Sequence, residues 1–156
     1  MRLVPFFILL LLFGCDSNRV FERYEEFKDK AWKIQEPAEF EFTISDVSKK
    51  YNVLYNVRNS LDYPYARLFI EYTLSDSAGA VLSKKLLSNY LFDQKTGRPL
   101  GRSGLGDVYD HQFLLLQNQS FQTAGVYHMR LEQFNRLDTL TGILAIGVRV
   151  ETVEME

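Results

Sequence analysis

The chain has 156 residues with 18 basic and 20 acidic side chains, and it contains a single cysteine. This length is enough for one domain with its own hydrophobic core. The formal net charge of −2 gives no basic footprint of the kind that binds nucleic acid, so no nucleic-acid partner is expected. A single cysteine excludes an intrachain disulfide, and the fold must therefore be stabilised by its core.

The first fourteen residues have the layout of a secretory signal. Arg2 gives a positive start, and an apolar run follows from Leu3 to Leu12. An apolar run of roughly 7–15 residues is typical of signal peptides, whereas a helix that spans a bilayer needs about 20. We therefore predict a signal peptide over residues 1–14 and no permanent transmembrane helix there.

Cys15 is the candidate for covalent attachment of lipid. The sequence Leu12-Phe13-Gly14-Cys15 resembles a lipobox, although Phe13 stands where a small residue is usual. In a lipobox the cysteine thiol takes a diacylglycerol as a thioether, and fatty acids such as palmitate complete the anchor. Because two or more acyl chains hold a protein stably, we predict a membrane-anchored lipoprotein. A buried or reactive cysteine is the alternative.

Residues 15–36 are predicted to form a tether and a lead segment. Phe21, Tyr24 and Phe27 are spaced by three, which fits a short amphipathic helix. The same aromatic residues also favour an extended arm across a sheet, and both conformations stay open. Trp32 is predicted to be a packing residue rather than a ligand platform.

From Pro37 onward the apolar residues alternate with polar ones at a period of two. Such alternation marks strands with one buried and one exposed face, and short connections exclude parallel βαβ units. In the last run, Leu144 and Ile146 are predicted to face the core. We predict an all-β domain over residues 37–156, an antiparallel β-sandwich of seven to eight strands, Ig-like or jelly-roll-like. The predicted strands are 39–45, 51–58, 66–75, 81–92, 113–121, 125–134 and 144–151.

A long connection, residues 93–112, interrupts this pattern and holds four of the nine glycines. Irregular loops of this length are uncommon and are often functional. We therefore predict a partner-contact loop here, made of Gly104, Gly106, Asp107, Tyr109, Asp110 and His111. A second turn, after residue 60, is expected to bring Arg58 and Asp62 together as an ion pair.

The same loop does not fit a nucleotide or metal site. Gly101, Gly104 and Gly106 follow the order G-x-x-G-x-G rather than G-x-G-x-x-G, and no βαβ unit follows them. Asp107, Asp110 and His111 fall short of the six to eight oxygens that calcium prefers. These aspartates are expected to accept backbone N–H bonds and shape the loop, so we predict no cofactor and no metal.

The sequence also offers little for catalysis. Its two histidines are His111 and His128, and His128 falls on the outward face of a predicted strand. No nucleophile elbow or zinc-protease motif occurs. Two carboxylates of Asp93, Asp107 and Asp110 could still cleave a glycan if they converged. We predict that the protein is not an enzyme.

Four further features occur in order along the chain: Cys15-Asp16 with Asn18-Arg19-Val20-Phe21; Asn56-Val57-Arg58-Asn59 leading to Asp62-Tyr63-Pro64-Tyr65; Gly104-Leu105-Gly106-Asp107-Val108-Tyr109-Asp110; and Gly142-Ile143 with Gly147-Val148-Arg149-Val150-Glu151. In this order they resemble the gliding-motility lipoprotein GldH family of the Bacteroidetes. The resemblance implies a cell-envelope protein of the gliding machinery, bound up with type IX secretion. The family has no established catalytic residues, so none are assigned.

The resulting hypothesis is a non-enzymatic, lipid-anchored component of the gliding machinery. Its partners would be the membrane and other motility or secretion proteins of the envelope, at the outer membrane and on its periplasmic side. The alternative is a glycan- or ligand-binding envelope module, in which Tyr63, Tyr65 and Tyr109 would stack on sugar rings.

Overall fold

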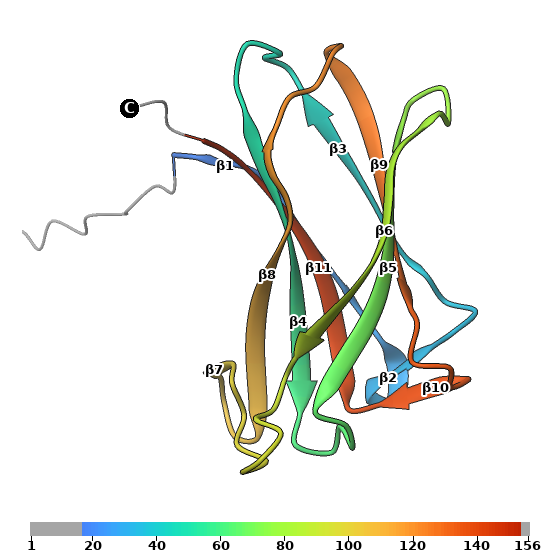
Figure 1. Ribbon diagram of the computed structural model, residues 1–156, viewed down its shortest axis with the longest axis vertical. Coiled ribbons are helices and arrows are strands. Elements are labelled where there is room, and N and C mark those ends of the chain that lie inside the picture. The colour runs from blue at the N-terminus through green and yellow to red at the C-terminus, as the bar shows by residue number, and fades with distance from the viewer. Residues whose placement is uncertain (1–16, 154–156) are drawn as a thin grey trace, which may run out of the picture.

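The computed structural model describes residues 17–153, which form two facing antiparallel sheets (Figure 1). One sheet has the order β1 (Arg19–Glu26), β11 (Ile143–Thr152), β4 (Tyr51–Ser60), β8 (Val108–Gln119) and β7 (Arg102–Ser103). The other has the order β3 (Ala38–Ile44), β9 (Gly125–Gln133), β5 (Arg67–Asp76) and β6 (Val81–Tyr90). A short ribbon pairs β2 (Ala31–Lys33), which follows the 3-10 turn η1 (Lys28–Lys30), with β10 (Thr139–Thr141). The all-β sandwich prediction is confirmed.

The core lies between the two sheets and is built from alternate residues of each strand. In β3, Phe40, Phe42 and Ile44 are buried, whereas Glu39, Glu41 and Thr43 are exposed or point outward. The neighbouring strand β9 and the strand β4 of the facing sheet also alternate over most of their length. Full burial of each such large apolar side chain contributes about 1.5–3 kcal/mol, and this inner face fixes the strand register.

Strand β11 departs from the predicted alternation at its first residues. Its pairing with β4 shifts between Ile143 and Ala145, so that one extra residue lies on β11. This bulge turns Ile143 into the core and leaves Leu144 half-buried. The prediction that Leu144 faces the core is therefore wrong, because a bulge reverses the alternation locally; Ile146 is buried as predicted.

The lead segment adopts the extended conformation of the two that its sequence allowed. Strand β1 pairs with β11 from Arg19 to Glu26 and becomes an edge of the five-stranded sheet. Tyr24 lies across Gly147, where a Cβ atom would come within 2.8 Å of its ring. Trp32 is fully buried and stacks on Phe27 with ring centroids 5.3 Å apart, which confirms its packing role. The ordered sandwich thus begins at Arg19, ahead of the division that we predicted at residue 37.

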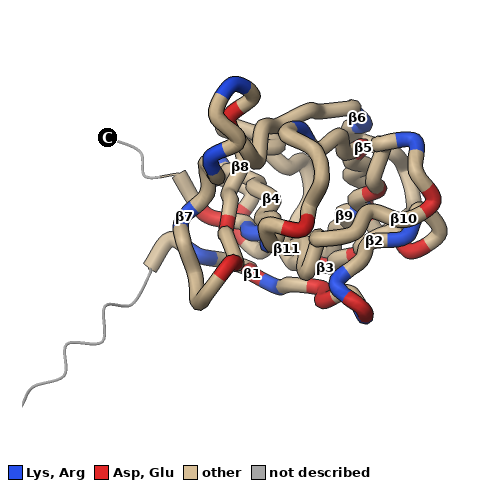
Figure 2. Tube along the Cα trace, turned by 90° about the horizontal axis from the view of Figure 1, so that it is seen from below, with Lys and Arg blue, Asp and Glu red and all other residues tan. Residues whose placement is uncertain are grey.

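The sandwich has two ends that differ in their connections. We call the end that holds Arg19, Tyr51 and Thr152 the terminal end; there the Thr152 N–H donates to the Asn18 carbonyl at 2.8 Å. We call the opposite end, with the connections 61–66, 91–101, 104–107 and 134–138, the loop end, which is the lower end in Figure 1. Basic and acidic residues are interspersed around both sheets when the molecule is viewed from that end (Figure 2). Within residues 17–153 no helix has the length and apolarity needed to cross a bilayer.

Candidate functional site

Most of the predicted contact loop is an ordered hairpin at the loop end. Strand β8 begins at Val108 rather than near Phe113, and Arg102 and Ser103 of β7 pair with Asp110 and Tyr109. The prediction of an irregular 93–112 loop is therefore wrong over these residues. Because this segment is rich in glycine and polar residues, its sequence does not show the alternation of a strand. The strand forms because β4 supplies its hydrogen-bond partners.

The tip of the β7–β8 hairpin carries Gly104, Leu105 and Gly106. Gly106 has φ +67, with nothing within 4 Å of the position that a Cβ would take; glycine adopts this left-handed conformation without steric cost. Leu105 is 95% exposed. The Asp107 carbonyl accepts the Leu61 N–H at 3.1 Å, which ties the tip to the β4–β5 connection. Leu105 was not among the predicted contact residues, although an apolar residue between two turn glycines indicates an exposed apolar side chain.

Asp110 is held by Arg58 from the neighbouring strand. The two residues are directly opposite in the β4–β8 pairing, and the Arg58 Nε donates to Asp110 Oδ1 at 2.8 Å. The Arg58 guanidinium also lies 5.6 Å from the ring centre of Tyr24. The hydrogen bond to Asp110 raises the pKa of Arg58. Arg58 thus pairs with Asp110 across the strands rather than with Asp62 as expected. The two residues are 52 positions apart in the sequence, so their pairing could not be predicted from it.

His111 points into the sandwich rather than toward solvent. It is 7% exposed and stacks on Phe113 with ring centroids 5.7 Å apart. Gly101 covers it so closely that a Cβ there would come within 2.7 Å of His111 Nε2, and this nitrogen has no hydrogen-bond partner among the described residues. Burial lowers the pKa of His111. Its side chain therefore lies largely inside the sandwich.

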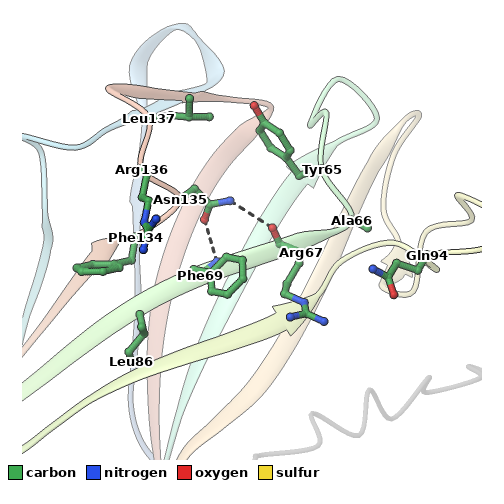
Figure 3. A pocket seen from close by; sticks show the side chains of 10 residues that line it. All are labelled: Tyr65, Ala66, Arg67, Phe69, Leu86, Gln94, Phe134, Asn135, Arg136 and Leu137. Atoms are coloured by element: carbon green, nitrogen blue, oxygen red, sulfur yellow. Dashed lines mark hydrogen bonds between the residues drawn. The ribbon is translucent and has the colours of Figure 1, made fainter.

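A cleft of about 550 Å³ lies beside these elements, on the outer face of the four-stranded sheet (Figure 3). Asn135 stands at its centre: its Oδ1 accepts the Phe69 N–H at 2.8 Å, and its Nδ2 donates to the Tyr63 hydroxyl at 3.1 Å and the Arg67 carbonyl at 3.3 Å. The volume lies in the usual range of ligand sites. The lining residues are Tyr65, Ala66, Arg67, Phe69, Leu86, Gln94, Phe134, Asn135, Arg136 and Leu137.

The three tyrosines proposed for sugar stacking do not share one exposed platform. Tyr63 is 3% exposed, and its hydroxyl donates to the Arg67 carbonyl at 2.9 Å. Burial raises its pKa. Tyr65 is exposed and meets Tyr63 edge-on at 5.7 Å, whereas Tyr109 lies on β8 and is half-buried. Tyr63 is therefore unavailable to a sugar ring, and the three-tyrosine form of that hypothesis is wrong.

The candidate acidic residues stabilise separate local structures. The Asp93 carboxylate accepts the N–H groups of Lys95 and Thr96 at 3.0 and 2.7 Å, and the hydrogen bond from Thr96 lowers its pKa. Asp110 is engaged by Arg58. His128 faces outward as predicted, with its Nδ1 3.3 Å from Glu41. Over residues 17–153 no three His, Cys, Asp or Glu side chains gather as metal ligands would.

These features define a β-sandwich domain. The polar groups at its loop end mainly form hydrogen bonds and ion pairs within the domain. The sequence pattern of the GldH lipoprotein family matches residues 19–150. The chain belongs to this family. It is 30% identical over 152 residues to the gliding motility lipoprotein GldH homolog of Christiangramia forsetii, covering 93% of this chain and 91% of that protein. It is 28% identical over 149 residues to the gliding motility lipoprotein GldH of Flavobacterium johnsoniae, covering 91% and 90%.

Among solved structures, the chain is similar to the VP2 subviral particle of infectious bursal disease virus. The TM-score is 0.39 and the sequence identity 9%, over 88% of this chain and 31% of that one.

Proposed function

We propose that this protein is a lipid-anchored, non-enzymatic component of the gliding-motility machinery, associated with type IX secretion. The names of its relatives and its membership of a lipoprotein family support a role in motility at the cell envelope. The lipobox-like sequence before Cys15 supports the anchor, and its residues lie outside the described part of the chain. The outer membrane, on its periplasmic side, is the proposed location.

The observation that carries this proposal is the position of β1, whose first residue, Arg19, lies at the terminal end of the sandwich. Cys15 precedes Arg19, the first residue of β1, by only four positions, which an extended chain covers in about 13 Å. An anchor at Cys15 therefore holds the terminal end near the membrane. Strand β4, with 10 residues, separates the loop end from the terminal end by about 30 Å. The loop end, with Leu105 at its tip, then faces other envelope proteins.

The engagement of the polar groups supports a contact role rather than catalysis. Asp93 closes its own turn, Asp110 is paired with Arg58, and His111 is buried. A general acid or base must reach a substrate proton, and His111 cannot do so without opening the contact with Gly101. Exposed apolar residues such as Leu105 suit docking instead.

Replacing Cys15 with serine tests the anchor. The Cys15→Ser variant should fold and be exported, and should appear in the soluble envelope fraction, because no acyl chain would hold it. The wild-type protein should remain with membranes after a high-salt wash. A Cys15→Ser variant that stays membrane-bound after that wash would refute the proposed anchor.

Deletion of the gene in a host that glides tests the motility role. Colony spreading should be lost, and expression of the wild-type chain should restore it. A Cys15→Ser chain should fail to restore it at equal cellular abundance. A deletion strain that spreads normally would contradict a role in gliding, whatever the membrane fractionation shows.

A further inference from the structure

The cleft around Asn135 combines an apolar surface with two cationic groups. Phe134, Leu86 and Leu137 are exposed large apolar residues, and Phe69 contributes a half-buried ring between the arginines in the view of Figure 3. Exposed apolar residues gathered in a concave site mark binding surfaces more often than scattered ones do. The cleft is therefore suited to an apolar side chain of a ligand.

The charges in the cleft are all of one sign. Arg67 and Arg136 line it, and none of the ten lining residues is acidic. Over residues 17–153 neither arginine takes part in an ion pair with a carboxylate. By contrast, Arg58, Arg130 and Arg149 all do. The cleft thus offers positive charge that this part of the chain leaves uncompensated.

The position of Arg67 leaves it able to bind an anion. Its guanidinium lies 4.3 Å from the ring centre of Tyr90, donates to the Tyr90 hydroxyl, and is 5.7 Å from the ring centre of Phe69. A guanidinium has five N–H donors in a fixed plane, so stacking orients it while leaving further donors for a carboxylate. An acidic group beside an aromatic or aliphatic side chain matches this arrangement.

The backbone around the cleft is fixed before any ligand arrives. Asn135 links the β9–β10 connection to Phe69 and Tyr63, and the Phe134 N–H donates to the Phe69 carbonyl at 2.8 Å. Arg136 follows with φ +58, a left-handed conformation uncommon for residues other than glycine. Rigid presentation of Phe134 and Arg136 reduces the entropy that binding would otherwise cost.

We propose that this cleft binds an acidic peptide segment of a partner protein, with an aromatic or aliphatic side chain next to an aspartate or glutamate. The apolar side chain would pack against Phe69 and Phe134, and the carboxylate would bind Arg67 and Arg136. The choice of a protein over a lipid headgroup rests on the proposed anchor, because the cleft lies at the loop end, about 30 Å beyond the membrane-proximal end.

Selection from a random peptide library displayed on phage tests this proposal on the full-length, lipidated protein in detergent. Peptides recovered by the wild-type protein should carry acidic residues next to Phe, Trp, Tyr or Leu. Their recovery should fall with the Arg67→Gln/Arg136→Gln variant and with Phe134→Ala. The matched control is Arg98→Gln, since Arg98 is exposed near the same end but does not line the cleft.

The strongest peptide then gives the affinity change by fluorescence anisotropy. Each Arg→Gln substitution should weaken binding about tenfold, the usual loss for one charge-assisted hydrogen bond. Replacing the peptide carboxylates by amides should do the same, and thermal unfolding should show that the variants remain folded. Soluble short-chain phosphatidylglycerol is the lipid probe in the same assay.

The proposal would be overturned if the selected peptides carried no acidic residues, or if the wild type and the double-arginine variant recovered them equally. It would also be overturned if the protein bound phosphatidylglycerol through the arginines and bound no peptide. None of these depends on the membrane fractionation of Cys15→Ser. A membrane-bound Cys15→Ser chain together with arginine-dependent peptide binding would refute the anchor while leaving the peptide site in place.

Discussion

The β3–β4 and β5–β6 turns at the terminal end are each shaped by an aspartate of the turn itself, whereas the connections at the loop end also bond to one another. In the β3–β4 turn Asp46 accepts the Ser48 N–H at 3.0 Å, and in the β5–β6 turn Asp76 accepts the N–H groups of Ala78 and Ala80 at 2.9 Å. At the loop end, the Ser60 N–H donates to the Gly142 carbonyl at 2.9 Å.

This difference indicates where changes stay local and where they spread. Asp76 bonds to Ala78 and Ala80 within its own turn, so its substitution is expected to affect that turn alone. At the loop end, Leu61 bonds to Asp107, Asn135 bonds to Tyr63, and the Leu91 N–H donates to the Ala66 carbonyl at 2.9 Å. The four connections therefore form one unit. A surface made by several bonded connections is rigid enough to present side chains to a partner. Because the connections depend on one another, a single substitution can also disrupt the whole surface.

The largest expected effect is that of adding a methyl group at Gly142. Its φ is +80, and a Cβ there would overlap the backbone nitrogen of Tyr63 and lie 2.6 Å from its Cα. Gly142→Ala should destabilise the fold by about 3 kcal/mol or more, because strain and a backbone clash add. Urea unfolding measures this loss.

Gly79 provides the matched control at the terminal end. Its φ is +83, but a methyl group added there would have nothing within 4 Å. Gly79→Ala should therefore cost only the left-handed backbone penalty, about 1–2 kcal/mol. Equal losses at the two glycines would show that the connections at the loop end are not interlocked as described.

A smaller effect is expected from acidification, through His111. Burial lowers the pKa of His111 below its ordinary value of 6.5. Above that pH the histidine is neutral in both folded and unfolded chains. As the pH falls below 6.5, His111 becomes protonated in the unfolded chain but stays neutral in the folded chain. The free energy of unfolding therefore decreases until the folded-state pKa is reached.

Thermal unfolding between about pH 5 and 7, the window above the ordinary range of carboxylates, measures this slope. The wild-type melting temperature should decrease toward acid, and the His111→Gln variant should lose part of that decrease. Parallel profiles for the two proteins would contradict the burial of a neutral His111 under Gly101.

The smallest effect is expected from the pair Arg58–Asp110, whose side chains are 39% and 31% exposed. A double-mutant cycle with Arg58→Gln and Asp110→Asn should give a coupling of about 0.5–1 kcal/mol that decreases in high salt, as for other solvent-accessible pairs. Lys49–Asp46 at the terminal end, 4.0 Å apart and more exposed, should give a coupling near zero. A larger coupling at Lys49–Asp46 would reverse the comparison between the ends.

Much of the fold could be predicted from the sequence, because burying one face of each strand imposes a period of two that is visible without a structure. The alternation in β3 and β9 is of this kind. The bulge at Leu144 was not visible, since it depends on how β11 meets β4. The start of β8 at Val108 was not predicted, because the polar residues Asp110, His111 and Gln112 break the apolar alternation and a glycine-rich turn precedes the strand.

The surfaces at the loop end were less predictable, because they join residues that are distant in the sequence. Arg58 and Asp110 are 52 positions apart, and Asn135 and Tyr63 are 72 apart. Nothing in either segment alone specifies its partner. The predicted contact residues Gly104 and Gly106 do lie at an exposed tip, yet the exposed side chain between them is Leu105.

Site-specific photo-crosslinking in the native host tests the central claim, that the loop end contacts envelope proteins. A photoreactive amino acid is placed at Leu105 and, in a second strain, at Val47, an exposed apolar residue in the β3–β4 turn of the terminal end. The account predicts discrete protein adducts from position 105 and none from position 47. Adducts from position 47 alone, with both proteins exported at equal levels, would contradict it.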